Sequence, residues 1–117
     1  MTQVFTKALL SGSTNGKLIK VVATATLGTT IHTAVAGTSS MDEIWLWAVN
    51  SDPTNRKLTI EFGGATAPDC LIEVTIPAES GLVPVVAGLL LQNSLVVTAF
   101  CATANVVMLG GYVNKIV

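Results

Sequence analysis

Charged residues are scarce in this chain. Among its 117 residues, 6 are Lys or Arg and 7 are Asp or Glu, a charged fraction of 11%, whereas a typical soluble domain has roughly 25%. The net charge is −1 and only Arg56 and Lys57 are adjacent cations, so no basic patch is available to neutralise nucleic-acid phosphates. The low charge argues against nucleic-acid binding and indicates a surface intended in part for protein partners.

Residues that carry chemistry are equally few. The only histidine is His32, in "TTIHTAV", and no nucleophile elbow, phosphate-binding loop or dinucleotide fingerprint is present. We predict that His32 is a surface or interface imidazole and that the chain is not an enzyme, with no cofactor, metal or small-molecule substrate. A catalytic site would need a base, a nucleophile and an orienting group in one place.

Long apolar runs are also missing. The segment 81–91 is interrupted by Pro84 and Gly88, and the apolar stretch after it contains threonine and asparagine, so neither can span a bilayer. The N-terminal residues do not resemble a signal peptide. We therefore expect synthesis in the cytosol and no membrane association.

Cysteine is limited to Cys70 and Cys101. Two cysteines make neither a disulfide framework nor a metal motif. We predict two buried thiols that pack as small hydrophobic side chains. A disulfide between neighbouring strands is the alternative.

Turn-forming residues recur about every ten residues, and the segments between them are rich in β-branched residues, which is typical of an all-β protein. The spacing predicts one domain over residues 1–117, a jelly-roll-like β-sandwich of eight to ten short antiparallel strands. Segment 3–10 is expected to form a hairpin with 17–26, and 42–50 is expected to pair with 56–62. The expected strands are 3–10, 17–26, 31–36, 42–50, 56–62, 70–76, 82–86, 89–91, 95–102 and 105–117.

The acidic residues are predicted to be solvated. Strand 56–62 alternates in polarity, which predicts Leu58 and Ile60 in the core and Thr59 and Glu61 in solvent. A hairpin centred near residue 67 would place Glu61 opposite Glu73, but the spacing matches no calcium loop. Three further carboxylates are expected to be solubilising or rim charges: Asp42, Glu43 and Glu79.

The segment "DEIWLWAVN", residues 42–50, is apolar on both faces of a strand. One face can line the core of a sandwich, and the other needs a separate cover. We predict that this cover is a second subunit, because interfaces of obligate oligomers resemble a core cut in half. A loop or terminal strand of the same chain is the alternative. The residues predicted to line the interface are Trp45, Trp47, Val49, Val83, Val85 and Leu90.

Two long segments resemble a known group of proteins. Residues 75–100, "TIPAESGLVPVVAGLLLQNSLVVTAF", and 105–116, "NVVMLGGYVNKI", are similar to small β-rich virion proteins of tailed bacteriophages, particularly head decoration (cement) proteins, and the earlier strands fit the same type. The resemblance implies a homotrimer on the outer surface of the virion capsid. Its partners would be other copies of itself and the major capsid protein, and it would clamp the shell against the pressure of packaged DNA. It assigns a role to no individual residue.

Two other functions remain open. Similar small β-sandwich proteins occur in phage tails, necks and baseplates, and location in the particle distinguishes these roles. A carbohydrate-binding β-sandwich could use Trp45 or Trp47 as a stacking platform for sugar rings. That function predicts an exposed aromatic ring flanked by hydrogen-bonding side chains.

Overall fold

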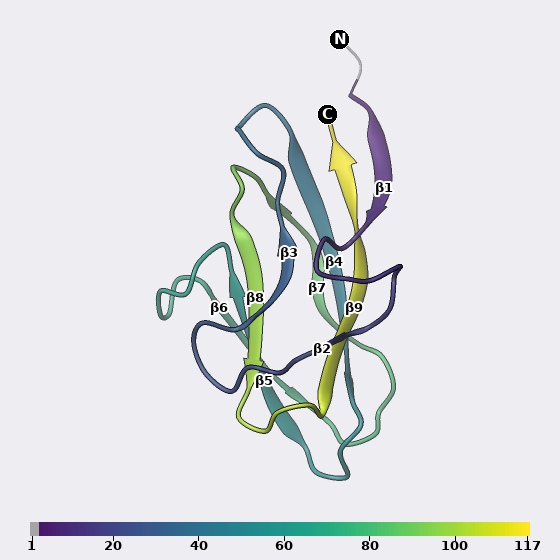
Figure 1. Ribbon diagram of the computed structural model, residues 1–117, viewed down its shortest axis with the longest axis vertical. Helices are drawn as coiled ribbons and strands as arrows, with labels where there is room; N and C mark the ends of the chain where they lie inside the picture. Colours follow the sequence, from purple (N-terminus) through teal and green to yellow (C-terminus); the bar gives the residue numbers. More distant parts are fainter. Residues whose placement is uncertain (1–2) are drawn as a thin grey trace.

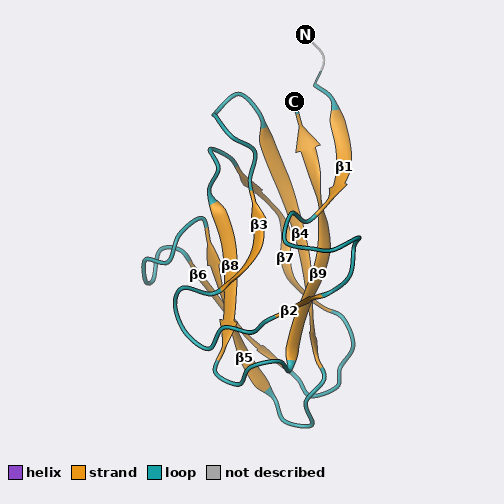
Figure 2. Ribbon diagram, viewed as in Figure 1, coloured by secondary structure: helices purple, strands orange, loops and turns teal. Residues whose placement is uncertain are grey.

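A computed structural model describes residues 3–117 as two β-sheets packed face to face (Figures 1 and 2). The molecule measures 50 × 27 × 21 Å along its principal axes. All strand pairs are antiparallel, which confirms the predicted all-β sandwich. Within the described residues there is no helix long and apolar enough to cross a membrane.

The first sheet has the strand order β1-β9-β4-β7, and the short strand β2 pairs with β9 on the same side as β1. Its strands are β1 (Phe5–Leu9), β2 (Ile19–Lys20), β4 (Met41–Asn50), β7 (Val83–Leu91) and β9 (Val107–Ile116).

The second sheet has the order β3-β8-β5-β6. Its strands are β3 (Thr29–Thr33), β5 (Arg56–Phe62), β6 (Leu71–Ile76) and β8 (Val96–Cys101).

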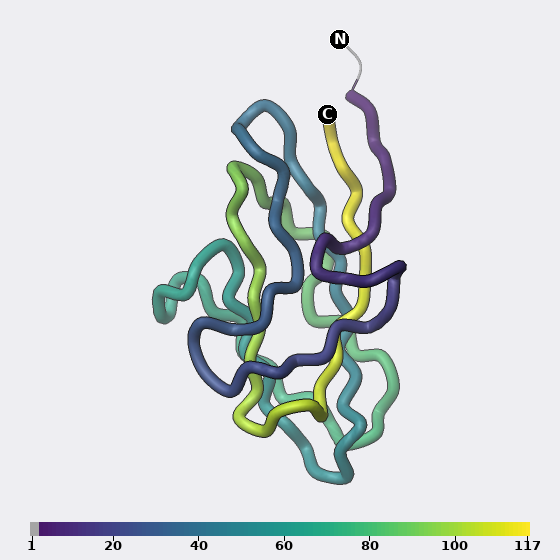
Figure 3. Tube along the Cα trace, in the orientation of Figure 1, coloured from purple at the N-terminus to yellow at the C-terminus, as the bar shows by residue number. Residues whose placement is uncertain are grey.

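The strand pairs show how the chain is wound. β5 pairs with β6, β4 with β7, β3 with β8 and β2 with β9, so the two halves of the chain run side by side like the arms of one long hairpin. Successive strands on each arm alternate between the sheets. This arrangement is a jelly roll, as the sequence predicts. Both chain ends lie at the same end of the molecule (Figure 3), where the backbones of Val4 and Val117 exchange two hydrogen bonds of 3.0 Å.

The predicted local pairings were wrong. β1 and β2 do not form a hairpin with each other, because both pair with β9. β4 and β5 belong to different sheets, so the turn after Asn50 carries the chain across the sandwich. Segments 82–86 and 89–91 form the single strand β7, which keeps its pairing with β4 through two irregularities in register. β5 does pair with β6, but Glu73 lies opposite Thr59 and not opposite Glu61, as a hairpin centred near residue 67 would require.

The core lies between the two sheets. Along β4, every second residue from Asp42 to Asn50 is buried and those between are half-buried, as expected for a strand with one inner face. Ile44, Leu46 and Ala48 are fully buried and belong to the core, with residues from both sheets. The other face of β4 therefore carries the two tryptophans outward.

Candidate interaction face

Three aromatic rings stack on the outer face of the first sheet. Trp45 and Trp47 come from β4, and Tyr112 lies directly opposite Trp45 on β9. The ring centroids are 6.4 Å apart for Trp45–Trp47, 6.4 Å for Trp45–Tyr112 and 6.1 Å for Trp47–Tyr112, with interplanar angles of 14° to 26°. All three side chains are half-buried. We call these three residues the aromatic cluster.

Glycines in the neighbouring strands make room for this cluster. Gly88 of β7 has a φ of 78°, and a Cβ there would lie 2.9 Å from Cζ2 of Trp45. The indole therefore rests directly on the β7 backbone, where only glycine has both the space and the conformational freedom. On the other side, Gly110 of β9 lies opposite Trp47 and under the side chain of Leu18, whose Cδ2 is 2.5 Å from the position of a Cβ.

A small polar group borders the cluster at one end. Oε1 of Glu43 accepts hydrogen bonds from the indole N–H of Trp45 at 2.7 Å and from the amide of Asn114 at 2.9 Å. These two bonds, from Trp45 first and Asn114 second, hold the pKa of the Glu43 carboxyl below its ordinary value. The ammonium of Lys7 lies 4.7 Å from the centroid of the Tyr112 ring, within range of a cation–π interaction.

Exposed apolar side chains surround the rest of the cluster. In an antiparallel pair, residues directly opposite each other share a face, so Leu9 and Phe5 of β1 lie on the same face as Tyr112. Leu90 of β7 lies opposite Glu43. The exposed fractions are 63% for Phe5, 56% for Leu9 and 52% for Leu90. Exposed apolar faces of this kind are typical of surfaces that bind proteins, membranes or ligands.

The predicted interface residues divide into two groups. Trp45, Trp47 and Val49 share the outer face of β4, and Leu90 extends this face onto β7. Val83 and Val85 are half-buried and pack against the core. Because β7 has irregular residues around Val85, simple alternation along the strand could not assign its faces.

Sequence reasoning missed Tyr112, Leu9 and Leu18, which join the face only through strand pairing. The sequence gives no sign that β9 pairs with β4 or that β1 and β2 pair with the other edge of β9, so these residues could not be added to the two tryptophans. β1 pairs with β9 and extends the sheet beyond it (Figure 1).

His32 is not on the surface, and its prediction was wrong. The side chain is 2% exposed, and Nε2 lies 2.7 Å from Oδ2 of Asp42, which is itself fully buried. The backbone N–H of Ser11 donates to Nδ1 at 3.0 Å. Asp42 was likewise wrongly predicted as a rim charge. Because both nitrogens of His32 are engaged inside the protein, neither is free to exchange a proton with a substrate.

Glu61 is also buried, against the prediction. Its carboxylate accepts hydrogen bonds from the hydroxyls of Thr98 at 2.6 Å and Thr26 at 2.9 Å, and from the backbone N–H of Gly28 at 2.8 Å. Burial alone would raise the pKa of this carboxyl, but the three donors outweigh it and lower the pKa. Thr59 is buried beside it. The alternating pattern of β5 failed here because segment 22–28 covers the part of the second sheet's outer face that contains Glu61.

The outer faces of the two sheets therefore differ. Segment 22–28 runs along β8, where the backbone N–H of Cys101 donates to the carbonyl of Ala23 at 3.2 Å. A hollow of about 330 Å³, lined mostly by apolar atoms, remains between Leu27 and Leu95.

Cys101 is a buried free thiol as predicted, whereas Cys70 is free and only half-buried.

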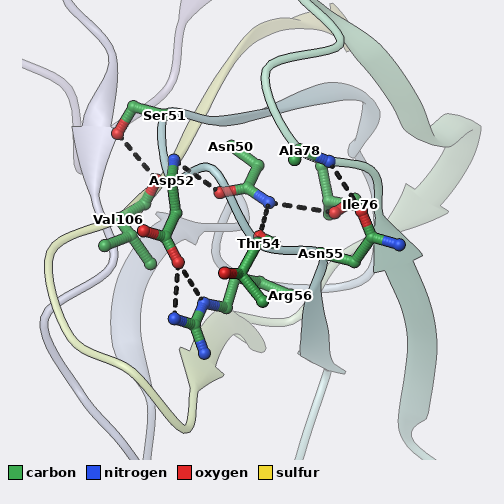
Figure 4. Close-up of polar contacts among 9 residues, drawn as sticks. All are labelled: Asn50, Ser51, Asp52, Thr54, Asn55, Arg56, Ile76, Ala78 and Val106. Atoms are coloured by element: carbon green, nitrogen blue, oxygen red, sulfur yellow. Dashed lines mark hydrogen bonds and ion pairs between the residues drawn. The ribbon is translucent and has the colours of Figure 1, made fainter.

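The turn between β4 and β5 is built around one buried amide (Figure 4). Nδ2 of Asn50 donates to the carbonyls of Thr54 at 2.9 Å and Ile76 at 3.0 Å, and Oδ1 accepts from the N–H of Asp52 at 2.9 Å. Asp52 forms an ion pair with Arg56. These contacts lie within the protein, so they fix the path of the turn between the two sheets.

Residues 3–117 contain no cluster of three or more histidine, cysteine or acidic side chains that could hold a metal ion. Comparison of the chain with protein-family models, with curated proteins and with solved structures gives no match.

Proposed function

We propose that this chain is a structural virion protein, a decoration (cement) protein that binds the outside of an assembled phage head as a homotrimer. The observation that carries the proposal is the apolar outer face of the first sheet, which is centred on the aromatic cluster and is only partly covered by residues 3–117. The jelly roll is consistent with this role, since capsid proteins use it, but a fold alone does not specify a function.

The aromatic cluster supplies the reason for assembly. Aromatic side chains bury 150–250 Å² each, and burial is worth about 25 cal/mol per Å², so covering the exposed parts of Trp45, Trp47 and Tyr112 stabilises an oligomer by several kcal/mol. The face carries few charges, as the centre of an oligomer interface requires. Assembly through this face leaves the second sheet and the chain ends available for the capsid.

Stabilisation of the shell then follows from mass action. A protein that binds only the assembled, expanded shell shifts the equilibrium toward that state. A trimer presents three equivalent contacts at once, so its avidity exceeds the affinity of one chain. No enzymatic step, cofactor, nucleic acid or membrane is needed.

The test is the native mass, measured by light scattering, of the wild type and of Trp47→Glu. The expected masses are three times the 12.1 kDa chain for the wild type and a monomer for the variant, because a charge at the centre of the face opposes burial. Leu27→Glu, at a 67% exposed leucine outside this face, is the matched control and should remain trimeric. A wild-type monomer, or a trimer unaffected by Trp47→Glu, would contradict the assignment of the face. Co-sedimentation with expanded but not unexpanded heads then tests the decoration role.

A carbohydrate-binding function is the second candidate, favoured by the polar group beside the rings. Glu43, Asn114 and Lys7 lie next to Trp45 and Tyr112, and sugar sites combine aromatic rings with a few polar groups. Quenching of tryptophan fluorescence by oligosaccharides in a monomeric wild type would support this candidate over assembly.

A further inference from the structure

We propose that His32 is an acid-sensitive latch, in which protonation of Nδ1 detaches residues 10–12 from β3 and loosens β1 along β9. The proposal does not depend on the oligomeric state or on the virion role. Its basis is the hydrogen bonding of the one histidine in the chain, which is buried between the two sheets.

The hydrogen bonds define the protonation state of the ring. A backbone N–H can only donate, so the bond from Ser11 to Nδ1 requires an unprotonated Nδ1. The ring proton is then on Nε2 and is donated to Asp42. His32 is thus neutral in this structure, with its tautomer set by Ser11 on one side and Asp42 on the other.

A second proton cannot be accommodated without movement. Protonated Nδ1 would face the N–H of Ser11 across 3.0 Å, placing two donors against each other at hydrogen-bond distance. The hydrogen bond from Nε2–H to Asp42 can form in either state of the ring, and Lys115 lies beyond Asp42, 3.5 Å from the other carboxylate oxygen. The contact with Asp42 is therefore retained, and the segment that must move is the one that carries Ser11. Segment 10–13 has no titratable side chain, and β8 places Val97 opposite His32.

Segment 10–12 cannot adjust by sliding. The N–H of Gly12 donates to the carbonyl of Ile31 at 3.0 Å, and the N–H of Thr33 donates to the hydroxyl of Ser11 at 2.7 Å. A Cβ on Gly12 would lie 2.6 Å from the carbonyl oxygen of Ile31, so the segment rests directly on the β3 backbone. Relief of the clash therefore detaches the segment.

The consequence reaches the outer face through β1. Leu10 is buried and follows directly after β1, so it anchors the strand whose Lys7 lies over Tyr112. Most side chains of β1 are exposed. Apart from its pairing with β9, β1 is held in place mainly by Leu10 and by the contacts of residues 10–12 with β3. Acid should therefore loosen the β1 border of the aromatic cluster while the core stays folded.

The test uses wild-type protein labelled with ¹⁵N-histidine, in which the single ring gives an unambiguous signal. As the pH is lowered from 7.5, the Nδ1 resonance reports when the ring takes up its second proton. Over the pH range in which Nδ1 becomes protonated, amide exchange of Ser11 and β1, corrected for intrinsic rates, should accelerate about tenfold, as the loss of a hydrogen bond implies. An Nδ1 that stays unprotonated until the whole protein unfolds in acid, or that protonates while Ser11 keeps its protection, overturns the proposal.

A variant separates the latch from general acid effects. His32→Asn keeps an acceptor close to the position of Nδ1 but does not titrate, so protection of the Ser11 amide should be independent of pH. Acid-dependent loss of protection in His32→Asn equal to that of the wild type would also overturn the proposal. If the variant does not fold, the wild-type comparison of the ring signal with Ser11 exchange still decides the question.

Discussion

At the scale of single residues, two carboxylates that look solvated in the sequence are buried and hydrogen-bonded. Asp42 and Glu61 are both 0% exposed, and every buried polar side-chain atom in residues 3–117 has a hydrogen-bond partner. Hydrophobic alternation could not predict this, because it reports which face of a strand a residue occupies and not what covers that face. The donors to Glu61 come from Thr26, Gly28 and Thr98, far from it in sequence.

Glu61 should make the stability of the protein depend on pH. Its pKa is lowered in the folded state, so its contribution is present above the pH at which an unfolded glutamate protonates, about 4.3. That contribution is lost as the pH falls below this value through the lower folded pKa. Glu61→Gln should lower the free energy of unfolding by about 1–3 kcal/mol near neutral pH. In acid, the difference in this free energy between the variant and the wild type should become smaller.

Urea unfolding at several pH values from 7 down to 3 checks this prediction. Glu73→Gln is the matched control, because Glu73 is 51% exposed and pairs only with the exposed Lys57, and such surface pairs contribute little. If the two substitutions lowered the free energy of unfolding equally at neutral pH, the three hydrogen bonds to the Glu61 carboxylate would not stabilise the fold as predicted.

At the scale of strands and turns, sequence reasoning predicted most segments and few pairings. The bounds of β4, β5 and β6 agree with expectation to within one residue, since each strand is bounded by turn-forming residues. The partners of β1 and β4 could not be predicted locally, because a jelly roll pairs strands from opposite ends of the chain. Turn chemistry shows where a strand stops, and the neighbour of that strand is determined by the packing of the whole sandwich.

The turn between β7 and β8 offers a test at this scale. Asn93 and Ser94 have φ angles of 63° and 58°, in the left-handed region that costs a side chain such as serine about 1 kcal/mol relative to glycine. Ser94→Gly should therefore stabilise the protein by about 0.5–1 kcal/mol and raise Tm by a few degrees.

Thermal unfolding followed by circular dichroism measures this change. Ser39→Gly is the matched control, since Ser39 is exposed in a loop and is not among the residues with positive φ. It should leave the midpoint unchanged or lower it, because glycine there only adds freedom to the unfolded chain. A rise in Tm for both variants would contradict the strain at Ser94.

At the scale of the whole molecule, two features support the proposed assembly through the outer face of the first sheet. They are the low charge of the chain and the difference between the outer faces of its two sheets. The described residues expose 6,200 Å², over which the whole chain distributes only 13 charged side chains. The second sheet is covered in part by segment 22–28, whereas the first presents its aromatic cluster outward. The sequence alone indicated a two-faced tryptophan strand, and the fold adds the border of β1, β7 and β9 around it.

An oligomer built on this face should resist salt. At 1 M salt the Debye length is about 3 Å, so assemblies held by surface charges weaken, whereas apolar burial is unaffected or strengthened, most by sulfate. The charges nearest the cluster, Lys7 and Glu43, are already engaged by Tyr112, Trp45 and Asn114, so few charges are left to pair across the interface. Sedimentation velocity from 0.05 to 1 M NaCl, and in sulfate, should therefore show a constant or tightening oligomer. Dissociation that increases steadily with NaCl would mean that charged side chains, and not the aromatic face, hold the subunits together.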